Sequence, residues 1–365
     1  MGGTLKIIKK EDSSKLIFTW SENPSIDLWN HIMFLSKKSN VSNLLSGKIQ
    51  SNRTLLFEQG DALEKKAKQI SLSVNQAYEY FKAADSITIA TKPLLYFYGM
   101  LSLAKSLIIA NTKETNLESL DYHGLTQKPR DKESQEYHEN PQNWTLEKEY
   151  AATAPGDFSK AVSDFEFPNG SIILFKDILA ICPEISSLYE LYYKEPSHTL
   201  YMYSYEEKSS APFVFELSFE PENEKETFRR IPEFEKEFSM LPQLKHGVAR
   251  TFRSKELEQF PEYMGIYHPP VGGQYVVRGI NYRVDSKYYS RYIDPIVVDY
   301  LGMYMLSMCV RYKQELWGDS TQGERTGIAS LIELYLTIVK RRFPNGVLNL
   351  FFGIPFWYGA PSYIS

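Results

Sequence analysis

The chain has 365 residues, of which 43% are hydrophobic and 24% are charged. This composition supports a substantial core in one large or two ordinary domains and excludes global disorder. The formal net charge of -4 argues against binding of nucleic acid through the overall charge of the protein. The 14% of aromatic residues requires a thick core or aromatic-lined grooves.

Only two cysteines occur, Cys182 and Cys309, and each lies in an apolar helical pattern. Two such thiols exclude a disulfide framework and do not have the paired spacing of a zinc site. The amino terminus lacks the apolar segment of a secretory signal, and the apolar run 300–310 is too short to cross a membrane. We therefore expect a cytoplasmic protein with no metal, no cofactor and no membrane partner.

The first third of the chain reads as mainly helical. Two short apolar runs within 5–20 are compatible with a small hairpin or an irregular lead-in. Apolar positions at helical spacing predict helices over 26–35 and 61–84. Pro93 suits the first turn of a further helix, because its missing N–H would have no partner there.

A polar stretch follows these helices. Residues 111–159 are dominated by charged, amide and proline side chains, which predicts a long surface excursion with little regular structure. Helical character returns over 172–193, with a break near Pro183. We group 1–195 as an N-terminal, mainly helical part that carries this excursion.

The pattern then changes to that of strands, which indicates a β section over 196–290. Residues 213–220 alternate strictly between apolar and polar side chains, as a half-buried strand does. Further strands are predicted over 199–205, 248–253 and 274–284. Consecutive strands without a crossover helix imply an antiparallel sheet.

The C-terminal part, 291–365, carries two strong helices, predicted over 295–317 and 327–343. The tail 351–358 is too apolar to remain in solvent, so it either packs on its own domain or forms an interface between copies of the chain. The predicted fold class is α+β, with a mainly helical body built from both halves of the chain and the antiparallel β section inserted between them.

The helix over 92–109 is too apolar to lie on a surface. Lys105 lies among its leucines, where it reaches the surface, pairs with a buried carboxylate or binds an anion. Lys92 lies at the helix start, where free N–H groups favour an anion, although an exposed lysine explains it equally well. Lys92, Tyr98 and Lys105 are candidate ligand-binding residues.

His123 precedes Gly124 just beyond this helix. A histidine in such a position is either a hydrogen-bonded turn residue or a group that exchanges protons near neutral pH. His123 is therefore the catalytic candidate only if the protein is an enzyme.

The helix over 295–317 is mostly apolar but carries a row of polar side chains along one face. The members of this row, three or four residues apart and so on one face, are Tyr300, Tyr304, Ser307, Arg311 and Glu315. Arg311 requires a partner, because burying its charge alone is very costly. That partner is a carboxylate of the protein, with Glu315 in reach, or an anionic ligand. Tyr304, Arg311 and Glu315 complete the candidate ligand-binding set.

The segments 92–105, 123–125 and 306–317 together resemble the YaaC-like family of bacterial proteins, and the resemblance extends over about residues 25–350. It implies a bacterial, cytoplasmic setting. It implies no reaction, because the family has no established activity.

Helix 92–109 alone is also similar to the central helix of HEPN domains, which occur in many bacterial toxin and anti-phage systems. Their ribonuclease members use an arginine followed four to six residues later by a histidine. Here Arg130 and His138 are separated by seven residues, which departs from that pattern.

The leading expectation is a ligand- or partner-binding regulatory module linked to phage defence. It would hold an anionic ligand, a nucleotide or RNA, or a protein partner near Lys105, His123 and Arg311. One alternative is a HEPN-like nuclease or nucleotide hydrolase, in which His123 transfers protons and Arg311 stabilises phosphate charge. The other is a scaffold subunit that forms homo-oligomers through the aromatic C-terminal tail.

Overall fold

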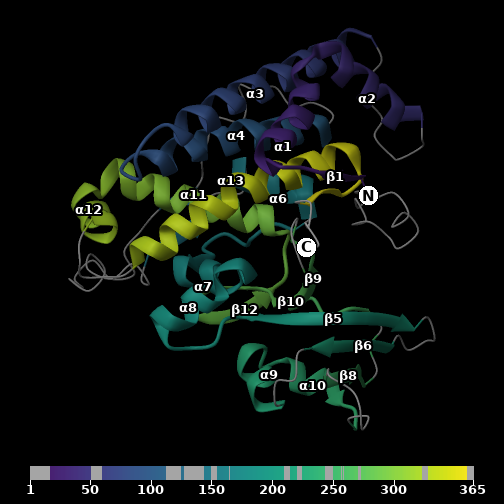
Figure 1. The fold of residues 1–365 in the computed structure, drawn as a ribbon, viewed down its shortest axis with the longest axis vertical. Helices are drawn as coiled ribbons and strands as arrows, with labels where there is room; N and C mark the ends of the chain where they lie inside the picture. The colour runs from purple at the N-terminus through teal and green to yellow at the C-terminus, as the bar shows by residue number, and fades with distance from the viewer. Residues whose placement is uncertain are drawn as a thin grey trace.

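A helical body lies above a six-stranded sheet in the computed structural model of the chain (Figure 1). The structure describes residues 17–50, 60–111, 125–126, 144–148, 154–163, 165–208, 214–219, 224–242, 250–255, 257, 259–269, 273–322 and 328–359.

The helical body is built from both ends of the chain. Its N-terminal elements are α1 (Pro24–Ile32), the 3-10 turn η2 (Met33–Ser36), α2 (Lys38–Gln50), α3 (Asp61–Asp85), α4 (Lys92–Asn111) and α6 (Ala154–Ser163). Its middle elements are α7 (Phe175–Ala180), η5 (Pro183–Ile185) and α8 (Ser186–Tyr193). Its C-terminal helices are α11 (Pro295–Tyr312), α12 (Gln314–Gln322) and α13 (Ile328–Phe352).

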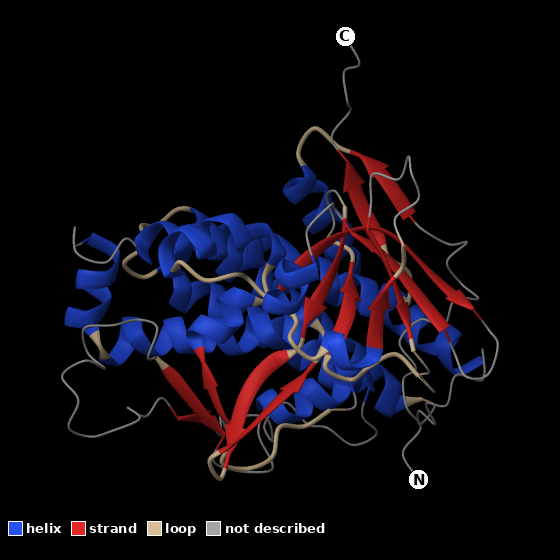
Figure 2. Cartoon of the chain, turned by 90° about the horizontal axis from the view of Figure 1, so that it is seen from below, coloured by secondary structure: helices blue, strands red, loops and turns tan. Residues whose placement is uncertain are grey.

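The described strands form three sheets, which gather beside the helices (Figure 2). The six-stranded sheet has the order β7 (Phe238–Met240), β8 (Arg250–Ser254), β6 (Val214–Phe219), β5 (Thr199–Lys208), β10 (Gln274–Arg278) and β9 (Met264–Tyr267). The five-stranded sheet has the order β12 (Lys287–Arg291), β11 (Ile280–Val284), β4 (Ile172–Leu174), β3 (Thr145–Lys148) and β2 (Leu125–Thr126). The third sheet pairs β1 (Ile17–Trp20) with β13 (Phe356–Gly359) in parallel.

These elements confirm the predicted α+β fold class, with antiparallel pairing throughout the two larger sheets. The helix predicted over 61–84 is α3, and the alternating segment 213–220 contains β6, whose side chains alternate between half-buried and buried. Both patterns follow from local spacing, so the sequence alone was enough to place them.

Several boundaries differ from the prediction. The helix predicted over 295–317 is broken at Lys313 into α11 and α12. The helix predicted over 327–343 continues through Pro344 to Phe352. Helix α2 was not predicted, and its apolar pattern is weak because serine, asparagine and lysine occupy most of its positions.

Two predictions of local structure were also wrong, and a third lies partly outside the described residues. The segment 172–193 begins with the strand β4 instead of a helix. Strand β1, from the second of the two apolar runs within 5–20, pairs with β13 at the far end of the chain, and the first run lies outside the described residues. The described parts of 111–159 include β2, β3 and the start of α6, which is more regular structure than a polar excursion implies.

The single strand predicted over 274–284 is divided at Gly279 between two sheets. A Cβ at Gly279 would lie 2.1 Å from the carbonyl carbon of Arg291 and 2.4 Å from the nitrogen of Tyr292. Only glycine allows this close backbone approach. The chain therefore passes at Gly279 from the six-stranded sheet to the sheet that packs on the helices.

The buried apolar residues form two clusters. The larger one joins both halves of the chain through α3, α4, α11 and α13, and it includes Ile280 and Tyr282 from β11. The smaller one fills the space between the six-stranded sheet and the helices α9 (Glu224–Arg230) and α10 (Phe234–Glu237). The six-stranded sheet and these two helices therefore have an apolar core separate from that of the helical body, whereas β11 and β12 pack with the body.

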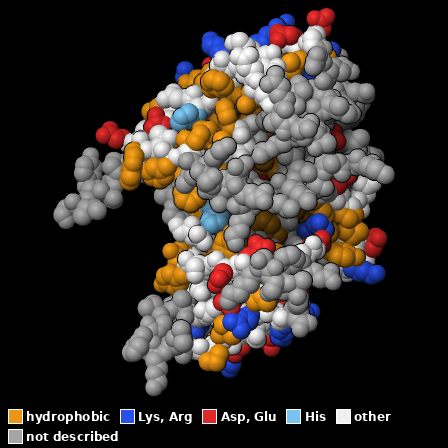
Figure 3. All heavy atoms as spheres, turned by 90° about the vertical axis from the view of Figure 1, so that its right-hand side faces the viewer, with side chains coloured by type: hydrophobic (Ala, Val, Ile, Leu, Met, Phe, Trp, Pro, Cys, Tyr) orange, Lys and Arg blue, Asp and Glu red, His pale blue; other side chains and the backbone are white. Residues whose placement is uncertain are grey.

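The apolar tail packs on its own chain. Phe356 and Tyr358 are buried, and the hydroxyl of Tyr358 lies 2.8 Å from Nδ1 of His31 on α1. The opposite face of the β1–β13 pair stays open, with 44% of Phe18 and 66% of Trp20 exposed. Strand β1 lies on the side of the molecule that Figure 3 turns toward the viewer, where hydrophobic side chains form patches.

One helix of the described chain, α4, is long and apolar enough to span a membrane. Its most apolar window is 78% buried inside the fold. Within this structure α4 is thus the central helix of the body, between α3 and α11.

Candidate functional site

Helices α4 and α11, which carry most of the predicted site, run antiparallel. Phe97 packs on Tyr300 and Tyr304, with ring centroids 5.5 and 5.4 Å apart. Nε1 of Trp317, just beyond α11, donates to the carbonyl of Ala90, just before α4, at 3.1 Å. The start of α4 therefore lies beside the end of α11.

This arrangement separates two of the predicted residues. Lys105 is eight residues beyond Phe97 on α4, and Arg311 is seven residues beyond Tyr304 on α11. Because the two helices run in opposite directions, the two distances along the helix axes add, and they separate Lys105 from Arg311 by roughly 20 Å. The structure does not bring Lys105 and Arg311 to one pocket.

Arg311 folds back on its own helix. Its guanidinium donates to the carbonyl of Ser307 at 3.3 Å and contacts Sδ of Met308 at 3.0 Å, and it lies 5.3 Å from the ring of Tyr312. In the described part of the chain it forms no ion pair with a carboxylate, and Glu315 is exposed on α12. The pair between Arg311 and Glu315, one of the alternatives that their spacing left open, is absent there, and the helix breaks between the two residues.

The other predicted residues have different surroundings. Lys92 is half-buried at the start of α4, the end at which Arg311 lies. Tyr98 is half-buried against Tyr80, with ring centroids 5.6 Å apart. Tyr304 is buried against Phe97. The predicted catalytic His123 lies outside the described residues, as do Arg130 and His138.

A buried polar network that the sequence analysis missed centres on Arg342 of α13. Its Nε donates to Oδ2 of Asp299 at 2.8 Å, and Nη2 donates to Oδ1 at 2.5 Å. Its Nη1 donates to Glu184 at 3.0 Å and lies 3.2 Å from Sγ of Cys182. The hydroxyl of Tyr267 on β9 donates to the same Glu184 at 2.9 Å.

This network holds Arg342 charged although the side chain is only 7% exposed. Burial alone lowers the pKa of a guanidinium, but the charges of Asp299 and Glu184 outweigh burial and keep the pKa of Arg342 well above its ordinary value. Burial also raises the pKa of Asp294, which caps α11 beside this network, to about 6.

A signal for this pair was present in the sequence. Asp299 is a lone acid in an apolar helix, and Arg342 lies at the predicted end of its own helix, 327–343, where the helix dipole alone would explain a cation. Because α13 continues to Phe352, Arg342 is in its interior and cannot serve as an end group. Two isolated opposite charges on separate apolar helices indicate a buried pair.

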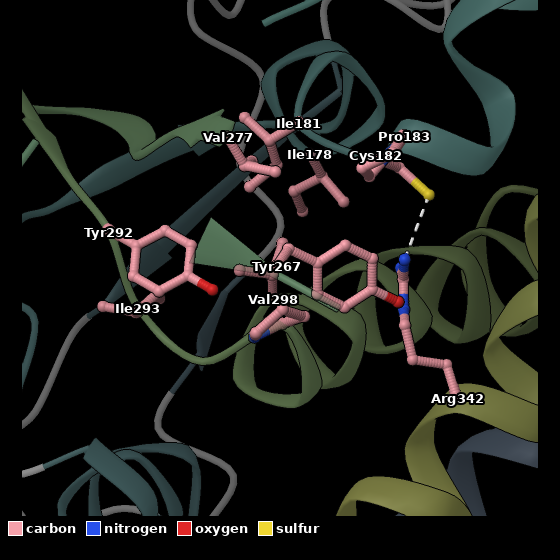
Figure 4. Close-up of a pocket in the computed structure, with 11 residues that line it drawn as sticks. Ile178, Ile181, Cys182, Pro183, Tyr267, Val277, Tyr292, Ile293, Val298 and Arg342 are labelled. Atoms are coloured by element: carbon pink, nitrogen blue, oxygen red, sulfur yellow. Dashed lines mark hydrogen bonds between the residues drawn. The ribbon is translucent and has the colours of Figure 1, made fainter. Parts of the chain in front are cut away.

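A small pocket lies next to this network, between the helical body and the six-stranded sheet (Figure 4). Its volume of about 20 Å³ is enough for a water molecule. Its walls are mainly aliphatic, from Ile178 and Ile181 of the body to Val277 of β10. Arg342 and Tyr267 supply polar groups at one side.

A second polar cluster lies where the chain enters the six-stranded sheet. Nδ1 of His198 and the hydroxyl of Tyr193 are buried and have no hydrogen-bond partner among the described residues. Burial and the nearby Arg278 lower the pKa of His198 to about 4. Burial raises the pKa of Asp177 to about 6 and outweighs the hydrogen bond from Asn281, which lowers this pKa. In the part of the chain that is described, no three such groups come together as metal ligands.

Comparison with known proteins agrees with the resemblance seen in the motifs. The fold and these polar clusters define an α+β protein with a helical body and an inserted sheet. The model of the family described as YaaC-like Protein matches residues 33–351, and the chain belongs to this family. No curated protein and no solved structure matches the chain.

Proposed function

We propose that this YaaC-like protein is a regulatory binding module that holds a phosphate-bearing ligand of nucleotide size. The binding site is the end of the helical body where α11 ends and α4 begins. Arg311 is its principal anchor and Lys92 its second cation.

The observation that carries this proposal is the contrast between Arg311 and Arg342. Arg342 is saturated by Asp299 and Glu184 of the same chain. Arg311 is half-buried, and the contacts described for its guanidinium are to neutral groups of its own helix. A guanidinium of this kind has donors to offer a phosphate in a two-point contact.

The surroundings support a small anion at this end. Lys92 begins α4, whose helix dipole favours negative charge at that point. Lys313, also half-buried, lies directly after α11. The net charge of -4 argues against binding of a long nucleic acid through the overall charge of the protein, which favours a nucleotide over RNA.

Arg311 also lies in the last turn of α11, where a cation stabilises the helix dipole. This role alone would make Arg311 a stability residue without a ligand. The experiment below separates the two roles, because a dipole effect changes stability and leaves nucleotide affinity unchanged.

The test is calorimetric titration of the full-length protein with ATP, GTP and a ten-nucleotide single-stranded RNA. We expect a nucleotide to bind and Arg311→Gln to weaken its binding at least tenfold. Arg229→Gln is the matched control, since Arg229 is exposed and paired with Glu226 on α9. Lys105→Gln is expected to bind normally, because Lys105 lies at the other end of α4.

Failure of all three probes to bind, or equal binding by wild type and Arg311→Gln, contradicts the proposal. Cleavage of the RNA or the nucleotide that is lost in His123→Ala would favour the enzyme alternative instead. A cytoplasmic location and a role in phage defence extend the proposal, and the latter depends on the likeness of helix 92–109 to HEPN domains. A deletion strain challenged with phage tests that role.

A further inference from the structure

The chain crosses between the helical body and the six-stranded sheet at two places. The chain enters the sheet after His198 and leaves it at Gly279. The backbone N–H of Arg278 donates to His198 at 2.9 Å and so ties the two crossings together. The N–H of His198 donates to Ala180 of α7 at 2.8 Å, and the N–H of Tyr292 donates to Glu262, just before β9, at 2.7 Å. The apolar clusters on either side are separate.

Away from these crossings, Tyr267 on β9 reaches from the sheet into the body. Its hydroxyl donates to Oε1 of Glu184, and the other oxygen of Glu184 accepts from Arg342. Its ring also lies 5.9 Å from the guanidinium carbon of Arg342. The pocket lies directly beside this contact, with Tyr267 and Arg342 both in its wall (Figure 4).

The two carboxylates of the network are not equivalent. Asp299 is fully buried and takes two hydrogen bonds from Arg342, whereas Glu184 is 18% exposed and takes one from it. Asp299 alone balances the single positive charge. Glu184 can therefore separate from Arg342 and leave the buried guanidinium paired with Asp299, while the loss of Asp299 would leave it with only the partly exposed Glu184.

We propose that the Tyr267–Glu184 contact is a latch that closes the six-stranded sheet over this pocket, with the crossings at His198 and Gly279 as its hinge. Release of the latch turns Tyr267 away from the body and opens the pocket to solvent. Asp299 keeps Arg342 paired in both states, so the helical body remains folded when the sheet swings. The latch does not depend on ligand binding at Arg311.

The two cysteines provide the readout. Cys182 lies in the wall of the pocket, and Cys309 is buried inside the helical body. Opening at the latch exposes the first thiol and leaves the second protected. Alkylation of the native full-length protein, followed by peptide mass spectrometry, measures the two rates in one sample.

We expect Tyr267→Phe to raise the alkylation rate of Cys182 at least fivefold and to leave that of Cys309 unchanged. The matched control is Tyr263→Phe, which removes one tyrosine hydrogen bond, to Glu233, within the sheet unit itself. That control should leave both rates at the wild-type values. Glu184→Ala, which removes the other half of the latch, should act like Tyr267→Phe.

An unchanged Cys182 rate in both Tyr267→Phe and Glu184→Ala overturns the proposal. Equal acceleration at Cys182 and Cys309 also overturns it, because it indicates unfolding of the whole chain. Circular dichroism of each variant confirms that the compared samples are folded.

Discussion

Arg342 and Asp299, 43 residues apart in the sequence, form a two-point ion pair inside the core, with Nε 2.8 Å from Oδ2. The pair joins α13 to α11, so it connects two helices of the C-terminal part across the middle of the body. Asp299 has no exposed surface. The pair is therefore screened little by salt and is expensive to break from one side.

Removal of one partner should destabilise the protein strongly. Asp299→Asn leaves Arg342 with Glu184 as its single ionised partner, and we expect the free energy of unfolding to fall by about 3 kcal/mol. The double variant Asp299→Leu with Arg342→Met removes both charges and should recover most of this loss. Urea denaturation followed by circular dichroism measures these differences.

The exposed Arg229, which pairs with Glu226 on the surface of α9, is the control for this experiment. Arg229→Met should change the free energy of unfolding by about 0.5 kcal/mol or less. A loss in Asp299→Asn no larger than that of the control would show that the buried pair does not stabilise the fold.

The sequence predicted those parts of the fold that depend on neighbours along the chain. Helix α3 and strand β6 repeat their apolar positions at fixed spacings, so each signals its structure locally. The pairing of β1 with β13 joins residues more than 300 positions apart, and no local pattern records such a pairing. The helix predicted over 327–343 was too short, since α13 continues through Pro344, where packing of that turn in the core keeps the helix intact.

The candidate site was predicted less well for the same reason. The spacing on α11 correctly placed Tyr300 and Tyr304 on one face, since both rings meet Phe97. The direction in which α4 and α11 cross is a tertiary property. Without it, Lys105 and Arg311 appeared as members of one site.

Gly99 on α4 is a position where packing should outweigh helix propensity. A Cβ there would lie 2.5 Å from the ring of Phe81 on α3. Gly99→Ala should gain about 1 kcal/mol from helix propensity and lose more to the clash, for a net destabilisation of about 1–2 kcal/mol. Thermal unfolding compares it with Gly47→Ala.

Gly47 is exposed on α2, and a Cβ added there would meet no atom within 4 Å, so this position isolates the propensity effect. Gly47→Ala should raise stability by about 0.5–1 kcal/mol. Equal stabilisation by both alanine variants would show that α3 and α4 do not approach as closely as this packing requires.

His198 should make the fold sensitive to acid. Burial and repulsion from Arg278 lower its pKa to about 4, below the value of about 6.5 expected in the unfolded chain. The unfolded chain therefore binds the proton first, and stability is lost as pH falls from 6.5 to 4, by up to about 3 kcal/mol. The nearby Glu195 and Glu233 oppose this effect, and Lys176 adds to it.

His198→Gln removes the titrating ring and should flatten this part of the stability profile. Urea denaturation at pH values between 4 and 7 measures the slope. The exposed Lys287 on β12 offers a control, since Lys287→Gln removes a charge that does not titrate in this range. A slope that is identical in wild type and His198→Gln would place the acid sensitivity elsewhere.

Asp177 should make the fold less stable as the pH rises, which is opposite to the effect of His198. Burial raises its pKa to about 6, above the unfolded value of about 3.9, although Asn281 and the nearby Lys176 and Arg278 favour the charged form. Its contribution to stability is therefore present at low pH and is lost as pH rises through 6. Asp177→Asn should raise the free energy of unfolding at pH 7.5 by about 1–3 kcal/mol and have little effect at pH 4.

Denaturation of Asp177→Asn at these two pH values tests the sign directly. Asp319→Asn on α12 removes an exposed carboxylate and should leave stability unchanged at both. Stabilisation by Asp177→Asn that is equal at pH 4 and pH 7.5 would show that the gain comes from packing or hydrogen bonding. A gain in the free energy of unfolding that is confined to pH 7.5 shows that the ionised carboxylate of Asp177 destabilises the fold. At pH 4 this carboxyl group is protonated in the folded chain, so replacing it by a neutral amide should change the stability little.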